Sequence, residues 1–157
     1  MRFLGIYLQD QLALGMLWRD TAWRAQRSNA GSEVGDALEI VATGITEDVE
    51  TFKQIMRRLD VRENAFKTGA AHAAERLGRL KPNGQFRGYS PLSRFVELEF
   101  LAMGIDGKQL LWTTLRDLAG LAERLPETDF DTLIERAERQ RAALEPHRRQ
   151  AGIAVLR

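Results

Sequence analysis

Apolar side chains recur at steps of three and four residues along most of this chain, and that spacing places them on one face of an α-helix. The pattern predicts helices over residues 3–28, 36–59, about 60–81, 90–123 and 128–157. No alternating pattern of similar strength indicates a β-strand, and no internal repeat is present. The sequence therefore predicts an all-α protein.

Turn-forming residues mark the first boundaries between these helices. A break after the first helix is predicted at Asn29, Gly31, Ser32 and Gly35. Asp60, with Glu63 three residues later, predicts the start of an alanine-rich third helix.

The second half of the chain carries stronger boundary signals. Ser90 is a favourable N-cap, because Pro91 then takes the first helical position, where its missing N–H costs nothing. Gly104 and Gly107 predict a kink or a short break in the helix that follows, and not two separate helices. Pro126 ends that helix, and Thr128 or Asp129 caps the last one.

Helices of about 24 residues span roughly 36 Å, a length that suits an antiparallel bundle. With 157 residues, of which 44% are hydrophobic, the chain is long enough to bury one core. We expect a single domain over 1–157, in which residues 1–124 form a four-helix bundle and residues 128–157 add a further helix.

Composition excludes several classes of protein. The chain has no cysteine, which removes disulfides and thiol chemistry. No window approaches the ~18 uninterrupted apolar residues of a membrane helix. Polar residues at positions 9–11 interrupt the apolar start, so no signal peptide is predicted. We therefore expect a cytoplasmic protein without contact to a membrane.

Four charged residues interrupt the predicted apolar faces: Asp10, Asp48, Glu97 and Lys108. They lie on three different segments and are predicted to point toward one interior. Buried acids are uncommon unless they are paired or hydrogen-bonded, so Lys108 is expected to reach Asp10 or Asp48. The alternative is that these charges lie at the margins of wide apolar stripes, where water reaches them.

Five short stretches carry a resemblance to known proteins: Tyr7-Leu8-Gln9-Asp10, Glu47-Asp48, Gly78-Arg79-Leu80-Lys81, Tyr89-Ser90-Pro91-Leu92-Ser93 and Gly107-Lys108. They resemble a group of uncharacterised bacterial proteins placed near the ferritin-like superfamily of helical bundles. The resemblance covers roughly residues 4–124 and implies a fold, but no activity.

The di-metal site of ferritin-like proteins needs Glu-x-x-His pairs that this chain lacks. The residues three positions before His72 and His147 are Gly69 and Leu144. A Mg²⁺ or Mn²⁺ site made of carboxylates alone is an alternative. Lys108 argues against it, because its ammonium group already supplies the positive charge that a metal ion would bring to the carboxylates. We therefore predict no metal and no cofactor.

Other enzyme signatures are also missing, so no catalytic residue is predicted. No phosphate-binding GxxxxGK[ST] motif is present, and no local motif places a nucleophile on a strained turn. An active site formed between two chains of a dimer is an alternative. The sequence therefore favours a protein that is not an enzyme, without deciding the question.

A basic stretch without acids lies between Glu75 and Glu97 and contains Arg76, Arg79, Lys81, Arg87 and Arg94. With Phe86 and Tyr89 among them, these residues could bind phosphates or stack on bases. A solvated helix end explains them more simply, because a net charge of +1 supplies no long-range field for a nucleic acid.

Trp23 falls off the apolar stripe of the first helix, beside basic residues, and is predicted to be an exposed interface anchor. The apolar chain end, Ile153-Ala154-Val155-Leu156, also suggests a partner. A homodimer is therefore expected.

Two classes of function follow. The first is a metal-free, self-associating structural or protein-interaction module. The second is an enzyme or ligand-binding protein that uses the interior cluster of Asp10, Asp48, Glu97 and Lys108. The sequence does not indicate which small molecule such a protein would bind.

Overall fold

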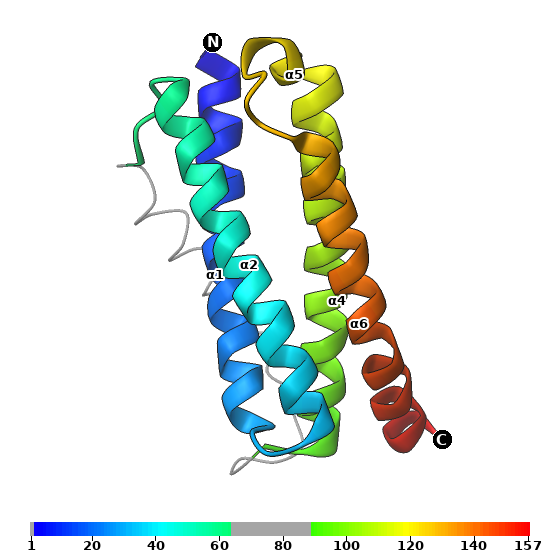
Figure 1. Ribbon diagram of the computed structural model, residues 1–157. Helices are drawn as coiled ribbons and strands as arrows, with labels where there is room; N and C mark the ends of the chain where they lie inside the picture. Colours follow the sequence, from blue (N-terminus) through cyan, green and yellow to red (C-terminus); the bar gives the residue numbers. More distant parts are fainter. Residues whose placement is uncertain (1, 64–88) are drawn as a thin grey trace.

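The computed structural model describes residues 2–63 and 89–157, and within them every regular element is helical. The all-α prediction is therefore confirmed for this part of the chain. The elements are α1 (Arg2–Ser28), α2 (Glu33–Arg58), α4 (Pro91–Thr113), the π-helical turn η2 (Thr114–Leu118), α5 (Leu121–Arg124) and α6 (Phe130–Leu156) (Figure 1).

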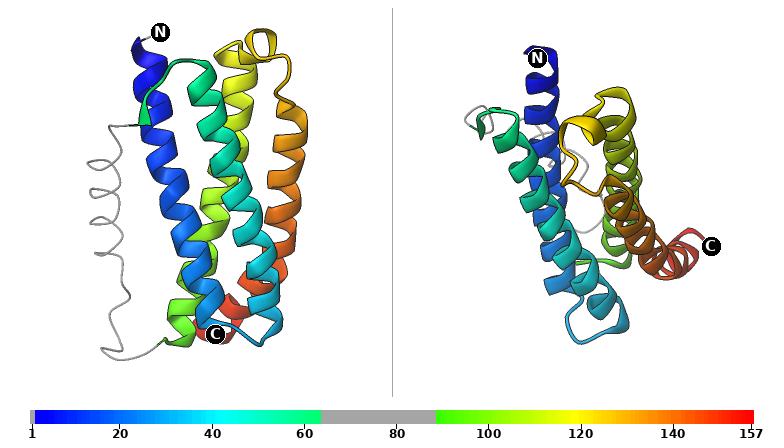
Figure 2. Two further views of the ribbon diagram at one scale, coloured as in Figure 1. Left: turned by 60° about the vertical axis from the view of Figure 1, so that its left-hand side comes forward. Right: turned by 45° about the horizontal axis from the view of Figure 1, so that its top comes forward.

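The long helices α1, α2, α4 and α6 lie side by side (Figures 1 and 2). Helix α1 contacts α2 and α4, and α6 contacts the same two helices from the other side. Helices α2 and α4 run in one direction and α1 and α6 in the other, so each helix is antiparallel to both of its neighbours. The end of α2 and the start of α4 consequently lie at opposite ends of the molecule.

Helix α6 packs against α4 and α2 and is one of the four long helices of the described residues. Its side chains contact α4 and the η2 turn in a regular antiparallel register, which joins Asp131 to Arg116 of η2 and, on α4, Glu138 to Gln109, Arg141 to Asp106 and Arg148 to Glu99. Together α4 and α6 form one side of the molecule, and α1 and α2 form the other.

The predicted third helix cannot be followed, since residues 64–88 lie outside the described part of the chain. At its expected start, Asp60 has a left-handed backbone with φ of 55°, and residues 60–62 are not helical. Asp60 follows the last residues of α2 instead of capping a new helix.

Local sequence signals explain where the long helices begin. Ser90 and Asp129 cap α4 and α6 as predicted, because their side chains accept hydrogen bonds from the N–H groups of Ser93 and Thr132. Helix α2 begins at Glu33, three residues earlier than predicted, since Ser32 caps it. A Cβ on Gly35 would collide with the carbonyl of Asn29, so the tight turn between α1 and α2 requires glycine there.

The break that was the alternative to a kink at Gly104 and Gly107 is absent from α4. Helix α4 runs without a break to Thr113, and its interruption is the π-helical turn that follows. Gly104 serves packing instead, because a Cβ there would lie 2.5 Å from the ring of Trp18. Glycine inside a helix costs roughly 1 kcal/mol relative to alanine.

Apolar packing is divided into two clusters along the bundle axis. One includes Leu12, Phe52 and Trp112, and the other includes Leu38, Leu98 and other residues nearer the α1–α2 turn. None of the helices in the described ranges is long and apolar enough to cross a membrane. The polar residues considered next lie between the two clusters.

Candidate functional site

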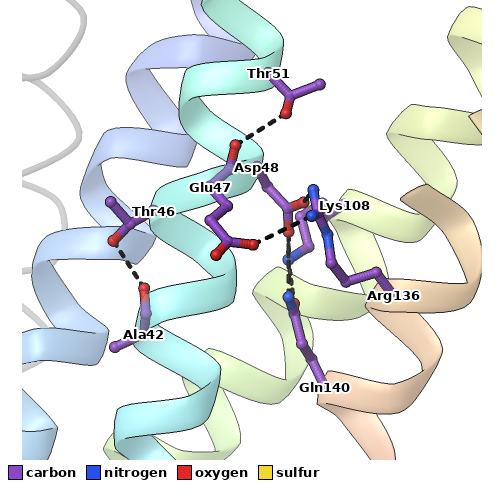
Figure 3. Close-up of polar contacts among 8 residues, drawn as sticks. All are labelled: Ala42, Thr46, Glu47, Asp48, Thr51, Lys108, Arg136 and Gln140. Carbon is purple, nitrogen blue, oxygen red and sulfur yellow. Dashed lines mark hydrogen bonds and ion pairs between the residues drawn. The ribbon is translucent and has the colours of Figure 1, made fainter. Parts of the chain in front are cut away.

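A buried carboxylate, that of Asp48, forms the centre of the polar cluster (Figure 3). Asp48 stands on α2 between Ile45, which packs in one apolar cluster, and Val49, which packs in the other. Its residue exposure is only 2%. A carboxylate at this depth is stable only when charged or polar partners replace water.

Three side chains supply those partners. Lys108 Nζ of α4 lies 2.5 Å from Asp48 Oδ2, and Gln140 Nε2 of α6 donates to the same oxygen at 3.3 Å. Arg136 Nη2, also of α6, donates to Asp48 Oδ1. The predicted pairing of Lys108 with an acid of another helix is thus confirmed, with Asp48 as the acid.

Lys108 is largely enclosed within this cluster. Besides Asp48, its ammonium group donates to Gln140 Oε1. Burial lowers the pKa of Lys108, and the neighbouring Asp48 carboxylate opposes that shift. Gly44 makes room for the amide, because a Cβ at that position of α2 would collide with Gln140.

Arg136 connects the buried cluster with the surface. Its Nη1 lies 3.3 Å from Glu47 Oε2, a carboxylate that is largely exposed (Figure 3). Its Nε is buried and has no hydrogen-bond partner. The interior thus holds two cations, Lys108 and Arg136, against the single buried carboxylate of Asp48.

A pocket of about 360 Å³ lies between α1, α2 and α4, and Asp48 and Lys108 belong to its wall. The rest of the wall is mostly apolar and includes Leu12, Trp18, Val49, Phe52, Ile105 and Leu111. Leu14, Met103 and Leu110 also line it and are exposed, so the pocket opens to the surface between α1 and α4. Its size is at the lower end of the range for small-molecule sites.

Trp112 also belongs to the residues that line this pocket. It is 1% exposed and packs against Phe52, with ring centroids 5.8 Å apart. Its indole N–H is buried and has no hydrogen-bond partner. Buried indole groups are usually hydrogen-bonded, so this unmatched donor is a feature that a function should explain.

The prediction that Asp10 points into the same interior is wrong, because Asp10 is exposed on α1. The buried face of α1 is centred on Leu8 and Leu12. Asp10 is two residues from each of them, and two residues turn a helix by about 200°. Its side chain therefore lies on the opposite face.

Glu97 is also separate from the cluster. It stands eleven residues before Lys108 on an unbroken helix, a rise of about 16 Å. Its Oε1 lies 3.7 Å from Arg24 Nε, whereas its Oε2 is buried without a partner. Burial raises the pKa of this carboxyl, and the nearby Arg24 guanidinium and Tyr89 hydroxyl oppose that shift.

Most of the predicted anion-binding stretch, namely Arg76, Arg79, Lys81 and Arg87, lies outside the described residues. Arg94 is exposed on the first turn of α4, and its guanidinium carbon lies 6.0 Å from the centre of the Tyr89 ring. This arrangement is a weak cation–π contact.

Trp23 is not the exposed anchor that its position suggested. It is half-buried and packs against the apolar cluster nearer the α1–α2 turn. Its Nε1 donates to Thr46 Oγ1 of α2 at 3.0 Å. Trp23 is therefore a contact between α1 and α2 within one chain.

Sequence reasoning missed Arg136, Gln140 and Trp112 as members of the site. Gln140 could have been found, because it stands on the buried stripe of α6 between Ala137 and Leu144. A polar residue at such a position is the same signal that identified Asp48. Nothing in the local pattern distinguishes Arg136 from the other arginines of α6.

Within residues 2–63 and 89–157, no three His, Cys, Asp or Glu side chains come together in a way that could hold a metal ion. The arrangement favours binding over metal chemistry: an apolar pocket with hydrogen-bond donors in its wall. Comparison with known proteins yields no matching family model, no matching curated protein and no matching solved structure.

Proposed function

We propose that this protein binds a small, mostly apolar molecule in the pocket between α1, α2 and α4. The observation that carries the proposal is the buried Asp48–Lys108 pair in the wall of an otherwise apolar pocket. Ligand sites commonly combine an apolar lining with a few polar groups that fix orientation. Burying a charged pair seldom stabilises a fold more than apolar packing would, so a role in binding accounts for its place here.

The pocket can be tested with N-phenyl-1-naphthylamine, a neutral apolar dye whose fluorescence rises in apolar surroundings. We expect saturable binding at one site per chain. Gly107 and Gly15 line the pocket from α4 and α1. A Cβ on Gly107 would meet no atom within 4 Å, and one on Gly15 would make only an ordinary contact with Val49. Larger side chains at these positions should therefore occupy the pocket without moving the backbone.

Gly107→Leu and Gly15→Leu should each weaken dye binding, whereas Gly107→Ala, which fills almost no space, should bind as the natural sequence does. Circular dichroism checks that all three variants fold. Dye binding that does not saturate, or that is equal in the natural protein and in both leucine variants, would contradict the proposal.

The ferritin-like relationship belongs to this proposal at the level of architecture. Four long antiparallel helices, with α2 and α4 running in the same direction, support it, because ferritin-like bundles contain one long crossover connection. The proposed binding does not require the metal chemistry of that superfamily.

Self-association is a second candidate function, supported by exposed apolar residues at the end of α6. Ile153 is 52% exposed and Leu156 is 67% exposed. If this surface joins two chains, light scattering should give the mass of a dimer, and replacing both residues with Asp should give a monomer. A monomer of the natural protein at all concentrations would contradict a homodimer.

A further inference from the structure

The polar groups around the pocket can be matched donor by donor. A lysine ammonium group has three N–H donors, and that of Lys108 makes two hydrogen bonds, to Asp48 Oδ2 and Gln140 Oε1. Both oxygens of Asp48 and the side-chain oxygen of Gln140 already accept hydrogen bonds. One N–H of Lys108 is consequently left for a group outside the cluster.

Trp112 supplies a second unmatched donor in the same wall. It stands four residues after Lys108 on α4, and residues at this spacing are neighbours on a helix surface. Both side chains line the pocket, and the indole N–H has no partner. Among the buried polar atoms of the cluster and the pocket wall, those without a partner, Trp112 Nε1 and Arg136 Nε, are both donors. A ligand that satisfies them must bring hydrogen-bond acceptors.

Charge specifies the acceptor further. The largely buried side chains of the cluster are two cations, Lys108 and Arg136, and the carboxylate of Asp48. Arg136 also pairs with Glu47 at 3.3 Å, but that carboxylate is largely exposed and reaches the cluster from the solvent side. One further negative charge beside Lys108 would balance the enclosed part of the cluster. A carboxylate supplies that charge, whereas a phosphate monoester brings nearly two.

We propose that the ligand is an apolar monocarboxylic acid whose carboxylate accepts hydrogen bonds from Lys108 Nζ and Trp112 Nε1. Its hydrocarbon part lies against the apolar wall formed by residues such as Leu12, Val49 and Phe52. This inference rests on the proposed function and deepens it, because it names the chemical class of the ligand.

Three compounds with the same eight-carbon chain test the inference: octanoate, octanol and octylamine. Each is titrated at pH 7 against protein that carries the neutral dye, and displacement gives its dissociation constant. A hydrogen bond to a charged group is worth enough to change an affinity by about tenfold or more. We therefore expect octanoate to bind at least about tenfold more tightly than octanol, and octylamine most weakly.

Variants assign this preference to the two donors. Lys108→Met should reduce the affinity for octanoate to that for octanol. Lys53→Met, which removes a lysine of α2 that pairs with Glu50 away from the pocket, should leave the preference unchanged. Trp112→Phe keeps an aromatic ring but removes the N–H. It should lower the affinity for octanoate several-fold and leave the affinity for octanol almost unchanged. Since Trp112→Phe retains Lys108, it also serves if Lys108→Met fails to fold.

Each outcome has a distinct meaning. If the dye binds in the pocket but octanoate and octanol bind equally, or if neither variant changes the preference, the carboxylate inference is wrong and the proposed function stands. If neither the dye nor any of the three compounds binds, both are wrong.

Discussion

At the scale of single residues, the main feature is a carboxylate held in the apolar interior by two cations and an amide. Asp48 lies at the boundary of the two apolar clusters, and each of its oxygens accepts a hydrogen bond from a cation. Burying such a carboxylate alone costs much free energy, but it is stable when all its hydrogen-bonding partners are present. Removing one partner should therefore lower the free energy of unfolding strongly.

The first prediction concerns Lys108→Met. Breaking a buried charge pair costs about 3–5 kcal/mol, and we expect about 3 kcal/mol here, because Arg136 continues to pair with Asp48. The value follows from urea midpoints at an unchanged slope. Arg139→Met, which breaks an exposed pair with Glu135, should change stability by no more than about 0.5 kcal/mol. Equal effects of the two variants would show that Lys108 is solvated.

The second prediction concerns pH and Glu97, whose pKa burial raises above 4.5. Below about pH 4.5 the carboxyl is protonated in both the folded and the unfolded chain. As the pH rises, the unfolded chain loses the proton first, so the free energy of unfolding falls until the folded carboxyl also ionises. Glu97→Gln cannot ionise and should lack this fall.

Urea midpoints from pH 4 to pH 7 measure the effect. The difference in stability between Glu97→Gln and the natural sequence should change in favour of the variant as the pH increases. Glu123→Gln, at an exposed position of α5, controls for the loss of one negative charge. Curves that stay parallel for Glu97→Gln and the natural protein would contradict this role of burial.

At the scale of helices, glycines decide how closely the elements approach one another. Gly104 allows Trp18 of α1 to lie against α4, and Gly44 allows Gln140 of α6 to lie against α2. Gly107 has no such neighbour. Glycines that look alike in a helical sequence thus have different consequences.

The third prediction compares two of these glycines. Gly44→Ala should destabilise the protein by about 1–3 kcal/mol, because the new methyl group displaces Gln140 from Asp48. Gly107→Ala should stabilise it by up to about 1 kcal/mol, since alanine favours a helix and the Cβ meets nothing. Thermal melting curves measure both, and a shift in the same direction for the two variants would overturn this interpretation.

At the scale of the whole molecule, α6 packs against both α2 and α4. It supplies Arg136 and Gln140 to the central cluster and pairs with η2 and α4 from Asp131 to Arg148. Helix α6 contributes buried residues to each apolar cluster: Leu133 belongs to one and Leu144 to the other. The core consequently depends on the last helix of the chain.

The fourth prediction follows from this dependence. A chain that ends at residue 124 should not unfold cooperatively, because Asp48 and Lys108 lose two of their partners and one side of the core is exposed to water. Circular dichroism during heating tests this. A sharp transition close to that of the full chain would show that residues 1–124 fold by themselves.

Much of the helical structure was predictable because helix formation depends on residues three or four positions apart. The caps at Ser90 and Asp129 are local signals of this kind, and the inward positions of Asp48 and Lys108 follow from the same periodicity. The error at Asp10 arose from the choice of the wrong stripe of α1 as the buried one. A wide apolar surface on that helix allows both choices until its neighbours are known.

The sequence by itself determined that the chain forms long helices, that α4 and α6 begin after Ser90 and Asp129, and that Asp48 and Lys108 interrupt apolar faces. Only the tertiary structure decided that α6 joins the bundle, that Trp23 packs within it, and that the central carboxylate meets Lys108, Arg136 and Gln140. Those partners lie 60, 88 and 92 residues from Asp48 along the chain. Periodicity shows which side of a helix is buried, but the identity of the facing helix depends on the packing of the whole chain.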